Sequence, residues 1–240
     1  MRLPIVAVSV ELLDAPHYEG VKRCQLFHAY LECLREAGLI PLLIAPDSTP
    51  NELQQILDNV DGVLLSGGDD IDLSLTGGDA PLEACKPVPE TQQRSVMAMV
   101  NIAVERDIPL LGICLGMQSL GIAHGAVLNQ HLPQHEQHTK GVEHSINVTA
   151  SGKLKDAVGS EPFSILSYHH QGLDSVSPPL KVVATADDGT IEAIELPDKE
   201  FVVGVQWHPE KTPASAATRA LFASFADAVN RYRAKRVKQS

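Results

Sequence analysis

Short apolar runs alternate with stretches of helical periodicity through the first half of the chain. The apolar runs predict strands, which we place at 4–10, 39–44, 62–66 and 108–113. The stretches between them predict helices, at 22–37, at 50–59 and around 96–104. Strands and helices that alternate in this way are typical of βαβ units. We therefore expect an α/β fold with a mostly parallel central sheet flanked by helices.

Two of the predicted helices carry further signals. Thr49 and Glu52 have the spacing of a capping box, with Pro50 at the first helical position. The later helix repeats apolar residues at i, i+3, i+4, i+7 and i+8, namely Val96, Met99, Val100, Ala103 and Val104. We expect this apolar face to pack on the sheet, so its methionine belongs to the core and not to a cofactor site.

The second half of the chain has shorter β-like runs, which predict a smaller antiparallel β portion. These runs lie at 143–149, 164–168, 180–185, 191–196 and 201–206. A C-terminal helix follows, with Leu221, Phe225 and Val229 on its inward face. Because no linker or internal repeat interrupts the chain, we expect residues 1–240 to form one domain.

The charge of the chain disfavours nucleic acid and membranes as partners. Nineteen Lys and Arg residues against 30 Asp and Glu residues give a formal net charge of -11, which repels phosphate backbones and anionic lipids. The one basic run, 231–238, is expected to end a helix or to fray in solvent. The apolar run at 3–10 is too short for a signal peptide, and no run is long enough to span a bilayer. The four cysteines do not resemble a disulfide framework, so we expect a cytoplasmic protein.

A cysteine lies where a predicted strand turns into a helix. The segment Gly112-Ile113-Cys114-Leu115-Gly116 has the G-x-nucleophile-x-G form, in which small residues allow a sharp turn that exposes the nucleophile. The N-terminus of the following helix favours a thiolate. The alternative is a buried structural cysteine between glycines, which this segment alone does not exclude.

A histidine and a glutamate follow the last predicted strand. Pro209 biases His208 toward an extended conformation, in which residues two apart project to the same side, so His208 and Glu210 are expected to meet. A nucleophilic cysteine needs a base, and the base needs a group that orients it. If the strands before Cys114 and His208 are parallel neighbours, both residues lie at the same carboxyl edge of the sheet.

A third strand ends in Ser66-Gly67-Gly68-Asp69. Backbone N–H groups at such a turn can stabilise a developing oxyanion, and the expected donors are Gly68 and Leu115. A simple glycine turn is the alternative. The segment lacks the Gly-Lys-Ser/Thr of a phosphate loop.

These three segments, in this order, resemble class I glutamine amidotransferases, and most of all the γ-glutamyl-γ-aminobutyrate hydrolases of peptidase family C26. The similarity extends from about residue 5 to 229 and includes Ser167-Tyr168-His169-His170-Gln171-Gly172. The resemblance implies a flavodoxin-like fold and a γ-glutamyl thioester on Cys114, without a cofactor. It also implies that His208 is the base, that Glu210 orients it, and that Gln118, His169, His170 and Gln171 contact a small γ-glutamyl substrate.

The sequence leaves several functions open. Leu115 stands where many of these hydrolases have Arg, and the loop 78–90 is short, so the leaving amine is not defined. A free-standing γ-glutamyl hydrolase is the first hypothesis. The alternatives are a glutaminase subunit that delivers ammonia to a partner synthase, and a binding module without activity. A homodimer is compatible with each.

Two clusters have the composition of metal sites but are not expected to bind metal. His131, His135, His138 and His144 cluster in the sequence and three of them have spacings that suit zinc, yet Pro133 disrupts the helix that such spacings require. Asp69, Asp70 and Asp72 lack the remaining ligands of a calcium loop. We expect these three residues to be solvated carboxylates that cap a turn.

Overall fold

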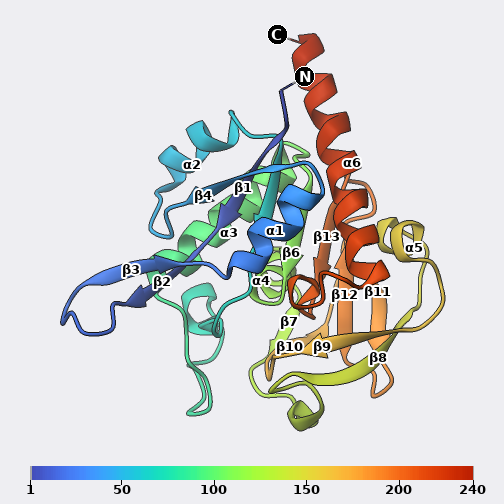
Figure 1. The fold of residues 1–240 in the computed structure, drawn as a ribbon. Helices are drawn as coiled ribbons and strands as arrows, with labels where there is room; N and C mark the ends of the chain where they lie inside the picture. The colour runs from blue at the N-terminus through green and yellow to red at the C-terminus, as the bar shows by residue number, and fades with distance from the viewer. Residues whose placement is uncertain (1, 240) are drawn as a thin grey trace.

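A computed structural model describes residues 2–239 and contains a nine-stranded sheet of order β4-β1-β5-β6-β13-β12-β11-β8-β9 (Figure 1). The first five strands in this order are parallel to one another. Their bounds are β4 Ile40–Ile44, β1 Ile5–Ser9, β5 Gly62–Leu65, β6 Leu110–Ile113 and β13 Val202–Val205. The predicted parallel sheet is confirmed.

The antiparallel portion continues the same sheet beyond β13. Its strands pair antiparallel in succession, and their bounds are β12 Ile191–Glu195, β11 Lys181–Ala186, β8 Val142–Val148 and β9 Phe163–Ser167. A small sheet of β7 (Val127–Asn129) and β10 (Gly172–Ser175) lies apart from it. β13 therefore has a parallel neighbour on one edge and an antiparallel neighbour on the other.

Helices cover both faces of the parallel strands because alternate strand residues point to opposite sides. On one face, helices α1 and α6 pack on residues such as Val8, Leu64 and Leu111, while α5 packs beside α6. On the other, α2, α3 and α4 pack on Ala7, Val63 and Leu65. The helix bounds are α1 His28–Glu36, α2 Pro50–Leu57, α3 Glu90–Glu105, α4 Leu115–Ala123, α5 Lys153–Val158 and α6 Ala216–Gln239.

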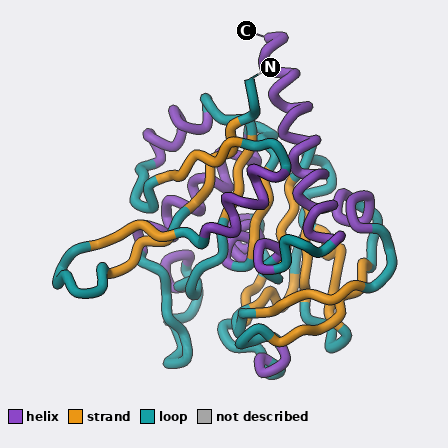
Figure 2. Tube along the Cα trace, in the orientation of Figure 1, coloured by secondary structure: helices purple, strands orange, loops and turns teal. Residues whose placement is uncertain are grey.

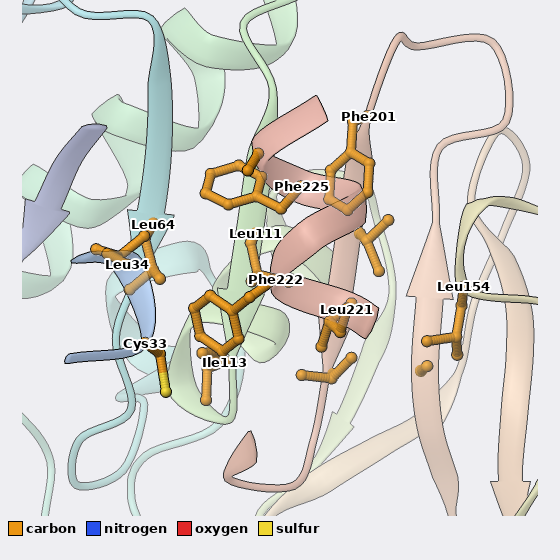
Figure 3. Packing of buried hydrophobic residues seen from close by; sticks show 14 of the residues in the cluster. Cys33, Leu34, Leu64, Leu111, Ile113, Leu154, Phe201, Leu221, Phe222 and Phe225 are labelled. Carbon is orange, nitrogen blue, oxygen red and sulfur yellow. The ribbon is translucent and has the colours of Figure 1, made fainter. Parts of the chain in front are cut away.

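The core beneath α6 is formed by large side chains from distant parts of the chain. Figure 3 shows Phe222 and Phe225 of α6 lying over Leu111 and Ile113 of β6. All three residues predicted for the inward face of this helix, Leu221, Phe225 and Val229, are buried. The basic run lies in the same helix, where Arg231 and Lys235 pair with Glu200 at 2.7 and 2.5 Å.

The predicted helix at 22–37 is partly wrong. Lys22–Gln25 is strand β3, which pairs with β2 (Glu11–Asp14) in a hairpin that projects from the body of the molecule (Figure 2), and α1 begins only at His28. Residues 22–25 form one strand of the hairpin, and none of their side chains is fully buried. A helix at these positions would therefore have no core to pack against.

The other predicted elements agree with the structure to within a few residues. The Thr49–Glu52 capping box is present at the start of α2. In α3, Val96, Met99, Val100 and Ala103 are buried, as their spacing predicted. None of the helices within residues 2–239 is both long and apolar enough to cross a membrane.

Candidate active site

Cys114 occupies a strained turn between β6 and α4. Its backbone has φ 50° and ψ -105°, a conformation that a residue with a side chain adopts only when its surroundings impose it. The flanking glycines allow this turn because there is no room for a side chain. A Cβ atom at Gly112 would lie 2.8 Å from the backbone of Gly116, and one at Gly116 would lie 2.5 Å from the carbonyl oxygen of Leu65.

The next strand of the sheet brings His208 to the same edge. β13 pairs in parallel with β6, and the amide of Cys114 donates to the carbonyl of Val205 at 2.8 Å. His208 is the third residue after this strand ends, and the Cys114 sulfur is close enough to raise the pKa of its ring. The parallel pairing that places the two residues together is therefore present.

Glu210 holds the other side of the imidazole. It lies in the short 3-10 helix Pro209–Lys211, is buried, and its Oε1 is 2.7 Å from His208 Nδ1. Gly67 allows the ring to approach, because a Cβ atom there would be 2.6 Å from His208 Cε1 and 3.5 Å from Cys114 Cβ. The structure thus brings the three residues predicted as a triad into one chain of contacts.

The charges of this chain of contacts favour a protonated imidazole. Burial alone would lower the pKa of His208, but the negative charge on the Cys114 sulfur and the Glu210 carboxylate outweigh it and raise that pKa to about 10. A protonated imidazole beside the Cys114 sulfur suits a histidine that donates a proton in a cysteine-dependent reaction.

The glycine turn after β5 lies next to Cys114. The amide of Gly67 donates to the hydroxyl of Tyr30 at 3.0 Å, so this N–H is already used. The next residue, Gly68, lines the same cavity as Cys114. At the start of α4 the amide of Leu115 has no acceptor within its own helix. Gly68 also lies against the side chain of Leu115, so the two residues predicted as oxyanion donors are neighbours beside Cys114.

A cavity of about 260 Å³ opens at Cys114. It is lined by residues from four loops and α4, namely Gly68, Asp69, Asp70, Ala84, Lys86, Cys114, Gln118, Tyr168, His169, His170 and Gln171. Every residue that the sequence assigned to the substrate therefore lies at this cavity.

Polar contacts fix the four residues predicted to bind the substrate. Gln118 Nε2 donates to the carbonyl of Gln171 at 3.1 Å, and His169 Nδ1 approaches the same oxygen at 2.9 Å. The side chain of Gln171 accepts from the amide of Ile71 at 3.0 Å. His170 lies 3.0 Å from Asp70. These contacts fix the 169–171 loop against the wall of the cavity.

Sequence reasoning missed two residues near Cys114. Gln206 Nε2 donates to Cys114 Sγ at 3.5 Å, and its Oε1 accepts from Gln118. The available signal was its position two residues before His208 at the end of a predicted strand, since residues two apart in an extended chain share a side. Tyr30, whose hydroxyl holds Gly67, comes from α1 and had no sequence signal.

The expectation that Asp69, Asp70 and Asp72 are solvated carboxylates that cap a turn is met only in part. Asp72 accepts from the amide of Ser74 at the start of a 3-10 helix, as expected for a capping residue. Asp70 is not a solvated carboxylate, because it accepts from the amide of Lys86 at 2.7 Å and contacts His170. Its carboxylate therefore belongs to the cavity wall.

Comparison with known proteins identifies the family. The family model of peptidase C26 matches residues 4–210. The chain is 33% identical over 255 residues to the gamma-glutamyl-gamma-aminobutyrate hydrolase of Escherichia coli O157:H7, covering 98% of this chain and 97% of that protein. It is 37% identical over 211 residues to a Mycobacterium tuberculosis protein described provisionally as a glutamine amidotransferase, covering 85% and 67%.

A solved structure shares the fold. A Thermoplasma acidophilum protein, described provisionally as one of the subunits of a GMP synthase, superposes with a TM-score of 0.70 at 17% identity, and all of both chains is covered. The fold expected from the resemblance is thus confirmed, with the parallel strands and the edge that carries Cys114 in place. The chain belongs to the peptidase C26 family, within the class I glutamine amidotransferase-like proteins, and is a hydrolytic enzyme.

Proposed function

We propose that this protein hydrolyses γ-glutamyl amide bonds through a thioester on Cys114, releasing glutamate and an amine. The observation that carries the proposal is His208 held between Cys114 and Glu210, with Nδ1 bonded to the carboxylate at 2.7 Å. This arrangement supplies a nucleophile, a proton carrier and an orienting group in one line.

In the proposed acylation, the Cys114 thiolate attacks the γ-carbonyl carbon and the carbonyl oxygen becomes an oxyanion. The amides of Gly68 and Leu115 donate to this oxyanion. His208, protonated in the free enzyme, gives its proton to the departing nitrogen as the C–N bond breaks, and the amine leaves.

In the proposed deacylation, neutral His208 removes a proton from water as the water oxygen attacks the thioester carbon. The C–S bond then breaks, glutamate forms, and the thiolate and imidazolium are restored. Glu210 stabilises the charged ring in both steps and keeps the same nitrogen facing the sulfur. Gln118 and the 169–171 loop bind the glutamyl portion of the substrate.

The rim of the cavity supports an amine leaving group that carries a positive charge, as in a γ-glutamyl-polyamine. Asp69 and Asp70 line the cavity with a single lysine, Lys86. Glu11 lies close enough that burial, followed by the charge of Asp69, raises its pKa. γ-Glutamyl-γ-aminobutyrate, the compound named for the Escherichia coli relative, is the other candidate substrate.

A panel of γ-glutamyl compounds tests the proposal. Purified protein is incubated with γ-glutamyl-γ-aminobutyrate, γ-glutamyl-polyamines and glutamine, and the release of glutamate is measured, with Cys114→Ala as the matched inactive variant. Turnover of an amine conjugate without any partner supports the proposal. Absence of turnover on every amine conjugate refutes it.

The second candidate is a glutaminase subunit that passes ammonia to a partner synthase. It is favoured by Leu115 and by the relative described provisionally as a glutamine amidotransferase. The same panel separates the two: slow cleavage of glutamine alone, with no turnover of amine conjugates, supports the second candidate.

A further inference from the structure

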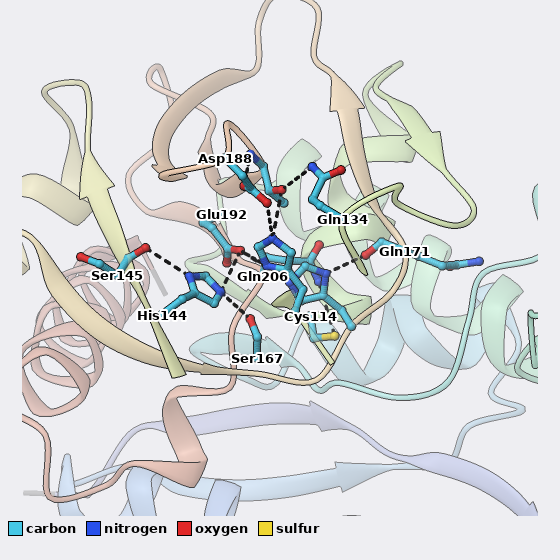
Figure 4. Close-up of polar contacts among 12 residues, drawn as sticks. Cys114, Gln134, His144, Ser145, Ser167, Gln171, Asp188, Glu192 and Gln206 are labelled. Atoms are coloured by element: carbon cyan, nitrogen blue, oxygen red, sulfur yellow. Dashed lines mark hydrogen bonds and ion pairs between the residues drawn. The ribbon is translucent and has the colours of Figure 1, made fainter. Parts of the chain in front are cut away.

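Three histidines surround a buried glutamate behind the substrate loop. The sequence cluster at 131–144 divides into two groups in the structure. His131 and His135 stack on each other with ring centroids 4.1 Å apart. His138 and His144 lie elsewhere, with centroids 4.7 Å apart, and are joined by His169. Figure 4 shows His144 facing Glu192, with Gln206 and Cys114 nearby.

The centre of this group is one carboxylate oxygen. Glu192 Oε1 lies 3.3 Å from His138 Nδ1, 3.6 Å from His144 Nε2 and 3.5 Å from His169 Nε2. The side chain of Glu192 is 0% exposed, and those of His138 and His169 are 1% and 2% exposed. The ligand atoms of His138, His144 and Glu192 all lie within 4.8 Å of one another.

These buried atoms have little to bond to among the residues that the structure describes. His138 Nδ1, His169 Nε2 and both oxygens of Glu192 make no hydrogen bond of normal length and alignment there. Only His144 Nε2 has another partner, the hydroxyl of Ser167 at 2.9 Å. Buried polar atoms without a partner are rare in folded proteins and indicate something that the site holds.

The outer nitrogen of each ring is already bonded to an oxygen that only accepts. His138 Nε2 lies 2.9 Å from Asp188 Oδ2. His144 Nδ1 lies 3.1 Å from the carbonyl of Ser145, and His169 Nδ1 lies 2.9 Å from that of Gln171. In neutral rings these nitrogens carry the hydrogen, so the three inner nitrogens present lone pairs to a carboxylate that also presents lone pairs. Such a group is stable only with a positive charge at its centre.

We propose that His138 Nδ1, His144 Nε2 and Glu192 Oε1 bind a Zn²⁺ ion. In a tetrahedral zinc site with bonds of about 2.0–2.1 Å, neighbouring ligand atoms are about 3.3–3.4 Å apart. The distances from Glu192 Oε1 to the two histidine nitrogens, 3.3 and 3.6 Å, are close to this size. Imidazole and carboxylate donors suit zinc, and the bonds of the outer nitrogens are those that orient zinc-binding histidines. When zinc binds, the bond from His144 Nε2 to the metal replaces the hydrogen bond between this nitrogen and the Ser167 hydroxyl.

We assign the ion a structural role, because the side chains of His138 and Glu192 are almost completely buried. The three ligands come from the residue after η2 (His135–Gln137), from β8 and from β12, so zinc would link these segments. His169 Nε2, which has no partner among the described residues, lies 3.5 Å from Glu192 Oε1, beside this group. The alternative occupant of the centre is a proton shared between His138 and Glu192.

Metal content of the full chain, prepared without a polyhistidine tag, tests the proposal. We expect about one zinc ion per chain after dialysis against zinc-free buffer. Co²⁺ added to chelator-treated protein should give the visible absorption of a tetrahedral site. Zinc removal should lower Tm, and restoring zinc should recover it.

Variants locate the site. His138→Gln and His144→Gln should lose the zinc, and Asp188→Asn should weaken zinc binding by about 10–100-fold, since Asp188 only orients His138. The matched control His135→Gln, in the other histidine group, should retain the zinc. If a ligand variant does not fold, the cobalt spectrum of the wild-type protein and the zinc affinity of Asp188→Asn still test the proposal.

Three outcomes overturn the proposal. One is wild-type protein that binds no zinc and keeps its Tm in the presence of a strong chelator, which would assign a shared proton to the centre. The second is zinc retained in both His138→Gln and His144→Gln. The third is zinc lost in His135→Gln but not in the ligand variants.

Discussion

His208 and Glu210 form a buried pair, with Nδ1 and Oε1 2.7 Å apart, two residues apart in the sequence. The carboxylate can orient the ring only because the chain turns into a 3-10 helix at Pro209, immediately after the histidine. The second oxygen of Glu210, Oε2, is buried and has no hydrogen-bond partner among residues 2–239. The imidazole of His208 is therefore the main group that stabilises this buried carboxylate.

Removing the base should cost more than removing the group that orients it. His208→Ala is expected to lower kcat by about 10³-fold or more, because both proton transfers are lost. Glu210→Gln should lower kcat by about 10–10²-fold, because the amide still bonds Nδ1 but no longer stabilises the imidazolium. Steady-state glutamate release by the two variants measures the difference. Wild-type kinetics in His208→Ala would contradict the assigned role.

The strain at Cys114 should appear as a gain in stability when it is relieved. Cys114→Ala keeps a side chain at φ 50°, whereas Cys114→Gly removes it. We expect both variants to be inactive, with the glycine variant more stable than the alanine variant by about 1 kcal/mol. Urea unfolding of the two proteins measures this difference. Equal stability would mean that the turn stores no strain.

Gly67 should be intolerant of a methyl group for a reason specific to the site. In Gly67→Ala the new Cβ would meet His208 Cε1 at 2.6 Å, so the ring must move and kcat should fall by about 10²-fold. The matched control is Gly121→Ala in α4, away from the cavity, whose Cβ would lie 2.7 Å from Cδ1 of the flexible Leu173 side chain. Glutamate release and Tm are measured for both. A larger kcat loss in the control would contradict the steric argument.

Stability should fall in alkaline solution because of His208. Its pKa is raised from 6.5 to about 10, so its contribution to stability is fully present below about pH 6.5 and is lost as the pH rises through about 10. The same deprotonation removes the proton given to the leaving amine, so kcat/KM should fall in that range. Tm and kcat/KM are followed from pH 7 to about pH 10.5.

The pH experiment has a matched variant. In His208→Ala the decline in Tm attributable to this group should be absent, while the titration of surface lysines remains. A wild-type Tm that declines no more steeply than that of the variant would show that the imidazolium does not contribute.

The strands that precede Cys114 and His208 could be predicted from the sequence because their apolar patterns are local. The run before Cys114 and the one before His208 are each buried on both faces, which gives continuous apolar segments. The hairpin of β2 and β3 could not be predicted, because its exposed residues carry no pattern of burial. Helix and hairpin could not be distinguished there from spacing alone.

Site residues could be predicted where function restricts a short segment, and not where distant segments meet. Cys114, His208 and Glu210 lie in two such segments. The group around Glu192 draws residues from 138 to 192 and depends on how β8, β11 and β12 pair. Spacing placed His131 with His138, whereas the fold separates them and adds His169. Only the folded chain could show that division.

The pairing of β13 on both edges has a consequence for how enzymes of this shape diversify. The strand before His208 is hydrogen-bonded to β6 on one side and to β12 on the other, so insertions and substitutions in the surrounding loops leave the histidine where it is. We therefore expect changes in the loop 78–90, which brings Ala84 and Lys86 to the cavity, to alter which substrates are accepted and to leave Cys114 and His208 in position.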